Sequence, residues 1–330
     1  MDITQRIDAV TKIDDIRIKM GGIQLPPKSV KIELTARCNL LCKYCAVGMR
    51  KKAPPRDMDF YFFKKITKDM RISGVEEIGL FYLGEPFMNL ELLCKAADYV
   101  KNKLGFPYVF LTSNATLAVP NAVKRVMSAG VDSIKWSVNF ADDVQFESIT
   151  CRDKDVFKAA IENIQAAWDV RNCGGYTTKL SASSILYGPD QKLKMDAFLK
   201  AQIIPYVDKH YWLPLYQMSM YKDHIEKVMG YVPTAGNMGR LDEKTLLPTR
   251  KSLPCWSAFT EGHVRANGGL SACCFGSDDR FDMGVLNGKN FMLAWNGEPF
   301  QKLREAQVRT LTEKQGALVG TPCEVCVAYE

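Results

Sequence analysis

The sequence predicts an α/β fold, in which a partly open barrel of six β/α pairs precedes a small cysteine-rich unit. Between residues 29 and 215, short apolar runs alternate with helical patterns, which is typical of a parallel sheet. Most of the eleven cysteines fall into two groups, one directly after the first of these runs and one near the carboxyl end. Six pairs are fewer than the eight of a closed barrel, so we expect an open one.

The predicted strands are short apolar runs that contain β-branched or aromatic residues. They occupy residues 29–35, 77–83, 108–114, 133–139, 178–186 and 209–215. Pro214 is unfavourable in the last of them, because proline cannot donate a backbone hydrogen bond. The predicted helices show amphipathic spacing, and several end at glycine. They occupy residues 59–74, 90–105, 120–130, 156–170 and 191–202.

These patterns divide the chain into four parts. We expect an N-terminal extension over 1–28, the barrel over 29–215, an aperiodic linker over 216–252 and the cysteine-rich unit over 253–330. In the last part, "HVRANGGLSACC" predicts two strands joined by an Asn-Gly-Gly turn. "AWNGEPFQKLREAQ" predicts a helix of about two or three turns.

Composition favours a soluble cytoplasmic protein with metal or redox chemistry. Hydrophobic residues make up 47% of the chain, and no apolar run is long enough to cross a membrane. The amino-terminal residues lack the apolar core of a signal peptide. The net charge is +7, but no stripe of basic residues interleaved with aromatics indicates nucleic-acid binding. Disulfides are rare in the cytoplasm, so eleven cysteines favour metal ligation.

The first cysteine group lies in "ARCNLLCKYCAVGM", residues 36–49. Cys38, Cys42 and Cys45 have the spacing C-x3-C-x2-C and follow the first predicted strand, at the barrel end where chemistry gathers. A closed metal site usually has four protein ligands, so three thiols predict an iron–sulfur site with one open position. The alternatives are a zinc site with a distant fourth ligand, or unrelated core cysteines.

This motif, with Tyr44 just before its last cysteine, resembles the signature of the radical S-adenosylmethionine (radical SAM) enzymes. The ends of the next three predicted strands agree with the resemblance. "LGEP" (83–86) resembles the family's Gly-Gly-Glu-Pro motif, with Leu83 in place of the first glycine. "TSN" (112–114) resembles its Thr-Asn-Gly turn, and "WSVN" (136–139) resembles its serine-containing strand. The match covers about residues 29–215 and implies a partial, TIM-like barrel of radical SAM type.

The resemblance implies that Cys38, Cys42 and Cys45 bind a [4Fe–4S] cluster whose free iron takes S-adenosylmethionine. Reduction of this cluster would give a 5′-deoxyadenosyl radical, which abstracts a hydrogen atom from the substrate. The residues implied for cofactor binding are Tyr44 near the adenine, Gly84 and Glu85 for the ammonium, and Ser113, Asn114, Ser137 and Asn139 for the ribose or carboxylate. Ser181 and Ser183 share one strand face and are further candidates. Each serine has an alternative role as a strand-end hydroxyl that caps a helix.

The second cysteine group completes a set of four thiols. Cys255 and Cys273 lie 18 positions apart, and "CEVC" adds Cys323 and Cys326. The spacing alone also permits a structural zinc ribbon. The unit resembles the shortened SPASM domain called a twitch domain, which implies that these four cysteines bind one auxiliary [4Fe–4S] cluster. Cys274 could replace Cys273; we favour Cys273, because adjacent residues of a strand face opposite ways.

The cysteine spacing resembles that of aminocyclitol and sugar radical SAM dehydrogenases. This implies oxidation of a small-molecule alcohol, with the auxiliary cluster as electron acceptor and a flavodoxin or ferredoxin as electron donor. The residue that accepts the proton is not assigned. An alternative is an enzyme that crosslinks or epimerises a ribosomal peptide, although about 28 residues before the first strand leave little room for a leader-recognition domain. A non-enzymatic zinc module is a third hypothesis, but it does not explain "LGEP".

Overall fold

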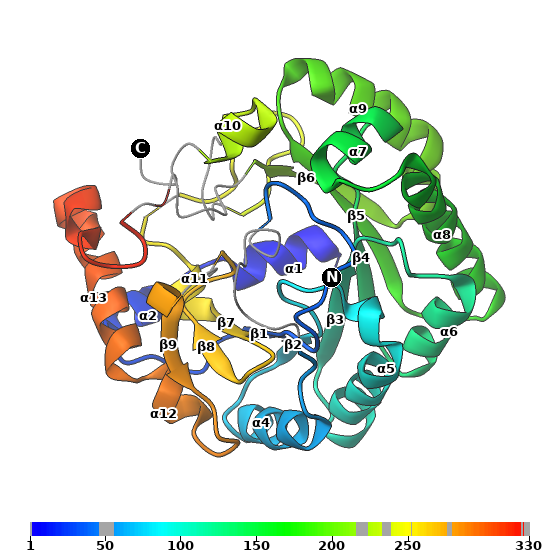
Figure 1. Cartoon of the computed structure of the whole chain (residues 1–330). Helices are drawn as coiled ribbons and strands as arrows, with labels where there is room; N and C mark the ends of the chain where they lie inside the picture. The colour runs from blue at the N-terminus through cyan, green and yellow to red at the C-terminus, as the bar shows by residue number, and fades with distance from the viewer. Residues whose placement is uncertain are drawn as a thin grey trace.

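One nine-stranded sheet organises the molecule. The computed structural model describes residues 2–45, 56–215, 224–232, 239–251, 253–275, 279–324 and 326. The strands follow the order β6-β5-β4-β3-β2-β1-β7-β8-β9, and the pairs from β6 to β1 are all parallel. Helices surround these parallel strands on their outer side (Figure 1). The predicted α/β fold with an open, parallel barrel is therefore confirmed.

Each predicted strand of the barrel forms within its predicted range. The strands are β1 (Ser29–Ile32), β2 (Glu77–Gly79), β3 (Tyr108–Ser113), β4 (Ser133–Ser137), β5 (Lys179–Leu186) and β6 (Lys209–Pro214). Pro214 is tolerated because β6 is an edge strand of the described sheet, where a missing backbone donor leaves no ladder bond unmade.

The five predicted helices of the barrel also form. They are α4 (Phe60–Ile72), α5 (Leu90–Asp98), α6 (Pro120–Ser128), α8 (Lys154–Cys173) and α9 (Pro189–Gln202). Helix α5 continues as the π-helix η2 (Tyr99–Lys103) before Gly105 ends it in a left-handed conformation. Short 3₁₀ helices follow β2 and α9, at η1 (Pro86–Asn89) and η3 (Ile204–Tyr206).

Three further helices lie outside the predicted set. Helix α7 (Asp143–Thr150) follows β4, and α1 (Ile3–Val10) and α2 (Asp15–Met20) fold within the amino-terminal extension. Arg6 of α1 pairs with Glu77 at the amino end of β2 at 2.5 Å. Its guanidinium also lies 3.8 Å from the ring centre of Phe110 on β3. Helix α1 therefore closes the barrel at the amino ends of the strands, behind the centre of the view in Figure 1.

The cysteine-rich unit adds its strands to the same sheet. Strand β7 (Glu261–Val264) runs parallel to β1, and β8 (Gly269–Ser271) and β9 (Asp282–Val285) follow it in antiparallel order. The predicted hairpin is thus confirmed. The predicted helix begins later and runs longer than expected, because Gly297 and Pro299 set its start and it extends over 16 residues. The other elements after β6 are α10 (His224–Met229), α11 (Ser257–Thr260), η4 (Asp279–Phe281), α12 (Phe291–Trp295), α13 (Glu298–Glu313) and η5 (Lys314–Leu318).

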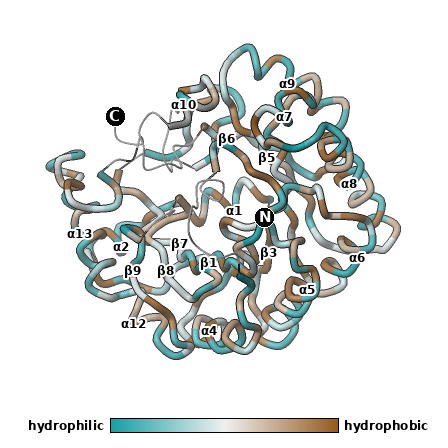
Figure 2. Tube along the Cα trace, viewed as in Figure 1, coloured by the Kyte–Doolittle hydropathy of each residue, from teal (hydrophilic) through white to brown (hydrophobic). Residues whose placement is uncertain are grey.

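The two faces of the barrel strands differ in polarity. On β4, Ile134 and Trp136 are fully buried in the core between the sheet and its helices. Because strand side chains alternate, Lys135 and Ser137 lie on the opposite, inner face. Figure 2 shows this alternation of hydrophobic and hydrophilic residues along the strands. Across the described ranges, no helix combines the length and apolar character that a membrane span needs.

Two buried arginines join the amino-terminal segment to the cysteine-rich unit. Arg17 donates to the carbonyl oxygens of Phe259 (2.6 Å) and Pro26 (2.7 Å). Arg304 of α13 is fully buried and donates to the carbonyl oxygens of Ala258 (2.7 Å) and Gly22 (2.9 Å). Such charge-assisted bonds satisfy carbonyls that would otherwise be buried without donors.

We expect Arg304→Met to lower the free energy of unfolding by about 3 kcal/mol, because it removes two buried charge-assisted hydrogen bonds. Urea unfolding of the full chain measures the change. Arg309→Met is the matched control, because Arg309 is exposed on the same helix. Equal unfolding midpoints for the two variants would contradict the assigned role.

Candidate iron–sulfur and cofactor site

The first cysteine loop is fixed by backbone contacts on two sides. It follows β1, and the amides of Leu41 and Lys43 donate to the carbonyls of Thr150 (3.2 Å) and Ile149 (3.0 Å) at the end of α7. The amide of Cys45 donates to the carbonyl of Cys42 at 3.0 Å, which tightens the loop between these two cysteines. Helix α7, which the sequence did not predict, therefore supports the loop.

The thiols of this loop lie in a dry environment that suits a bound cation. Burial raises the pKa of Cys38 to about 12, with contributions from Glu85 and Cys45. Burial also raises the pKa of Cys42 far above its ordinary value. A positively charged metal centre would reverse this preference and favour the thiolates.

The arrangement differs from a site for a single metal ion. Within the ranges that the structure describes, no three His, Cys, Asp or Glu side chains are placed to hold one ion. The three thiols of the loop are close enough to influence one another electrostatically. Three thiols in one loop are ligands of the kind that an iron–sulfur cluster takes.

Gly84 allows the end of β2 to approach the cysteine loop. A β-carbon at this position would lie 2.0 Å from the carbonyl oxygen of Thr35 and 2.8 Å from that of Arg37. The next amide, of Glu85, donates to the carbonyl of Arg37 at 2.8 Å. Only glycine fits this close backbone contact.

The Glu85 carboxylate is buried and held by three donors. It accepts hydrogen bonds from the Ser113 hydroxyl (2.8 Å) and from the amides of Asn114 (2.8 Å) and Phe87 (3.1 Å). Burial nevertheless raises the pKa of Glu85 to about 7. A cation placed against this carboxylate would stabilise its charged form. The structure thus places Ser113 and Asn114 around Glu85.

Two asparagines connect the strand ends to the cysteine loop. The Asn114 amide donates to the side chain of Asn39 at 3.1 Å and lies 4.0 Å from the Cys38 sulfur. Asn139 donates to the Tyr44 hydroxyl at 2.8 Å, and Tyr44 is partly buried against an apolar cluster. Six of the seven predicted cofactor-binding residues thus contact the loop or one another. The seventh, Ser137, lies at the end of β4 opposite Ser183 and joins none of the hydrogen bonds described here.

The four predicted ligands of the second site also gather together. Burial raises the pKa of Cys255, and Cys323 and Cys326 raise it further. Burial likewise raises the pKa of Cys273, with contributions from Cys274 and Cys323. The amide of Cys326 donates to the carbonyl of Cys323 at 3.1 Å, which closes the last turn. The four thiols therefore fit one closed cluster site.

The reason given for preferring Cys273 over Cys274 is wrong. Strand β8 ends at Ser271, so both cysteines lie in the turn beyond it and strand alternation does not separate them. Cys274 is half-buried, as Cys273 is, and its pKa responds to Lys31, Glu261 and Cys326. Both cysteines remain candidates for the fourth ligand.

Tyr82 joins the two sites, and the sequence reasoning missed it. Its hydroxyl donates to the carbonyl of Cys273 at 2.8 Å, two residues before Gly84 in the chain. Its ring centre lies 5.3 Å from that of His263 on β7. The second cysteine site therefore borders the segment predicted to bind the cofactor. The signal in the sequence that could have identified Tyr82 is its position, as a polar aromatic residue directly before "LGEP".

Charged residues on the inner strand faces were also missed. Lys31 of β1 pairs with Glu261 of β7 at 2.8 Å, and His263 contacts the same carboxylate at 3.1 Å. Burial disfavours the Glu261 carboxylate, but Lys31 and His263 outweigh it and hold its pKa at about 2. A lysine within an otherwise apolar strand, as at Lys31 and Lys135, could have indicated these charged inner faces in the sequence.

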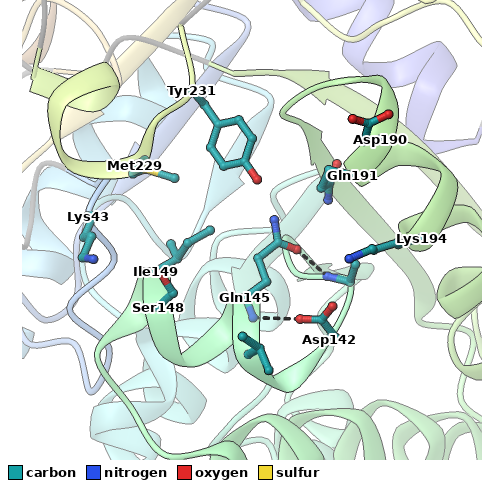
Figure 3. A pocket seen from close by; sticks show the side chains of 12 residues that line it. Lys43, Asp142, Gln145, Ser148, Ile149, Asp190, Gln191, Lys194, Met229 and Tyr231 are labelled. Atoms are coloured by element: carbon teal, nitrogen blue, oxygen red, sulfur yellow. Dashed lines mark hydrogen bonds between the residues drawn. The ribbon is translucent and has the colours of Figure 1, made fainter.

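A pocket of about 390 Å³ lies beside the cysteine loop (Figure 3). Lys43 of the loop, Gln145 of α7, Gln191 and Lys194 of α9, and Tyr231 line it. None of the seven residues predicted to bind S-adenosylmethionine belongs to its lining. The pocket is therefore separate from the predicted cofactor site.

Comparison with known families agrees with this geometry. Residues 32–179 match the radical SAM superfamily, and residues 255–327 match the SPASM iron–sulfur cluster-binding domain. The chain contains a radical SAM domain and a SPASM domain. Domains of these two kinds imply a [4Fe–4S] cluster, an auxiliary cluster and S-adenosylmethionine as cofactors.

Curated relatives match over part of this chain. The GTP 3′,8-cyclase of Synechococcus sp. (strain CC9902) is 33% identical over 137 residues, which cover 41% of this chain and 36% of that protein. The probable GTP 3′,8-cyclase of Methanococcus maripaludis (strain DSM 14266) is 30% identical over 123 residues, which cover 37% and 40%. The matched part of this chain thus spans less than half the length of these two relatives.

Two solved structures share the fold over most of this chain. BtrN in complex with AdoMet and 2-DOIA has a TM-score of 0.57 at 13% identity, over 92% of this chain and 94% of that one. SuiB of Streptococcus suis bound to S-adenosylmethionine has a TM-score of 0.60 at 15% identity, over 94% of this chain and 74% of that one. At such low identity, the structural similarity shows a common fold alone.

We expect Gly84→Ala to weaken S-adenosylmethionine binding by about tenfold or more, because the added methyl group separates β2 from the cysteine loop. Equilibrium dialysis of the cofactor against the cluster-loaded protein measures the change. Gly316→Ala is the control, since its methyl group would meet open space. Equal affinity in the two variants would show that the close contact is unimportant.

Proposed function

We propose that this protein is an oxidoreductase that oxidises an alcohol group of a small, sugar-like or aminocyclitol-like molecule. The observation that supports this most is the hydrogen bond from Tyr82 to the carbonyl of Cys273. Through this bond the second cysteine site, which is the proposed electron acceptor, would lie close to Gly84 and Glu85. Such an acceptor suits a reaction that ends in oxidation of the substrate.

The chain's own residues would hold the cofactors as follows. Cys38, Cys42 and Cys45 would bind the first cluster, and the auxiliary cluster would be bound by Cys255, Cys323, Cys326 and either Cys273 or Cys274. Gly84 and Glu85 hold the ammonium of S-adenosylmethionine, Tyr44 lies near its adenine, and Ser137 and Asn139 contact its ribose or carboxylate. When bound, these groups supply a 5′-deoxyadenosyl radical that removes a hydrogen atom from the substrate.

The protein contributes acceptors that are oriented in advance. Ser113, Asn114 and Phe87 fix the Glu85 carboxylate through hydrogen bonds of 2.8–3.1 Å. A carboxylate that is already oriented loses little conformational freedom when the ammonium binds. Burial excludes water, which strengthens the attraction between the two charges.

The interior of the barrel suits a polar substrate. Oxidation of a carbinol to a ketone removes one hydrogen atom, one electron and one proton. The inner faces carry Lys31, Lys135, Glu261 and Ser183, which can donate to or accept from hydroxyl groups. The fold shared with BtrN over nearly the whole of both chains supports the two-domain arrangement.

Single cysteine variants separate the two cluster sites. Two filled [4Fe–4S] clusters give about eight irons per chain, and loss of either gives about four. We expect Cys42→Ala to abolish S-adenosylmethionine cleavage, and Cys323→Ala to retain some cleavage without an oxidised product. Iron analysis and chromatography of 5′-deoxyadenosine measure both effects. Cys173→Ala is the control, because Cys173 is exposed at the end of α8.

Product stoichiometry tests the reaction type. With a panel of sugars and aminocyclitols and a flavodoxin or ferredoxin as reductant, we expect one S-adenosylmethionine consumed for each ketone formed. Mass spectrometry of the product and of 5′-deoxyadenosine gives the ratio. Regeneration of S-adenosylmethionine after each turnover, or activity on a peptide alone, would reject the alcohol-oxidation proposal.

A further inference from the structure

Lys135 projects into the barrel from the middle of β4. Its strand neighbours Ile134 and Trp136 are fully buried on the outer face, so Lys135 lies on the inner one. Its pKa responds to Lys31 of β1, Glu261 of β7 and Arg6 of α1. These elements surround the same interior, which places the Lys135 ammonium inside it. The side chain remains partly accessible, so a ligand in the interior can reach it.

Lys135 differs from the other interior cations in lacking an acidic partner. Lys31 pairs with Glu261 at 2.8 Å, and Arg6 pairs with Glu77 at 2.5 Å. Lys135 forms no hydrogen bond or ion pair with any residue that the structure describes. Burial, assisted by Lys31, lowers its pKa to about 8, although Cys274 and Glu261 oppose this change. A cation in this setting gains strongly from an added anion.

Ser181 provides a second donor at the same level of the barrel. It lies directly opposite Lys135 in the pairing of β4 with β5. Its hydroxyl is buried without a hydrogen-bond partner, and the residue is only 2% exposed. Ser183, the next residue on that face, is already engaged with Tyr211. A buried hydroxyl without a hydrogen-bond partner is destabilising, so a ligand that accepts a hydrogen bond from Ser181 would bind favourably.

We propose that Lys135 and Ser181 form a subsite for an anionic group of the substrate, a carboxylate or a phosphate. The ammonium supplies charge and the hydroxyl supplies a directed hydrogen bond, which together match an anionic oxygen. Glu261 faces the same interior, but its charge is already paired with Lys31, and His263 forms a hydrogen bond with the same carboxylate. This inference rests on the proposed function, because that function makes the barrel interior the substrate site. It narrows the substrate to sugar-like alcohols that carry an acidic group.

Binding of inorganic phosphate to the cluster-loaded protein tests this subsite without catalysis. Equilibrium dialysis with radiolabelled phosphate compares the wild type with three variants. We expect saturable binding in the wild type, about tenfold or greater weakening in Lys135→Met and about threefold weakening in Ser181→Ala. Lys158→Met should bind as the wild type does, because Lys158 is exposed on α8. Displacement by unlabelled acetate identifies a carboxylate site, and resistance to acetate identifies a phosphate site.

Absence of saturable binding in the wild type, or equal binding in Lys135→Met, overturns the proposal. Thermal unfolding and iron content show whether each variant has folded. If Lys135→Met does not fold, Lys135→Arg should retain binding while Ser181→Ala weakens it, and equal affinities of these two would reject the subsite. Phosphate binding without oxidation of any alcohol would reject the proposed function alone. Ketone formation with no phosphate binding would reject the subsite alone.

Discussion

The parallel pairing of β1 with β7 is the contact on which both candidate sites depend. It joins segments more than 200 residues apart, through bonds such as that from the Glu33 amide to the Val264 carbonyl at 2.8 Å. On its other side β1 pairs with β2. The first cysteine loop follows β1, Gly84 follows β2, and Cys273 follows the hairpin that begins with β7. Because hydrogen bonds fix β1 on both sides, the spacing of the two sites is set by the sheet rather than by flexible loops.

A continuous series of short contacts runs between the two cysteine sites. The Asn114 side chain lies near Cys38, and the backbone amide of Asn114 donates to Glu85. Three residues before Glu85, the Tyr82 hydroxyl donates to the Cys273 carbonyl. The series depends on the absence of a side chain at Gly84, where two backbones meet. A shift of the β2 end would therefore disturb the cofactor segment and the second cysteine site together.

Local patterns in the sequence predicted the barrel strands, the cysteine loop and the "LGEP" segment, because each is specified by neighbouring residues. The pairing of Ser29 with Glu261 has no local signature, since it depends on segments that meet only in the folded chain. Helix α1 is short and depends on its contact between Arg6 and Glu77. Strand alternation could not decide between Cys273 and Cys274, because β8 ends at Ser271, after an irregular register, and strand boundaries are poorly specified by sequence.

Buried cations in this molecule fall into two groups that their partners distinguish. Arg17 and Arg304 each donate at least two hydrogen bonds to backbone carbonyls, and they join the amino-terminal segment to the cysteine-rich unit. Their role is structural, since each guanidinium joins backbone carbonyls of two distant segments. Lys135 is enclosed as well, yet its charge has no compensating group in the described part of the chain. A fold retains such a cation at a cost in stability, and the cost is offset when the charge serves binding. This contrast is the reason for our proposal that the barrel interior is the substrate site: within the described residues Lys31 and Arg6 are paired with carboxylates, and Lys135 is not.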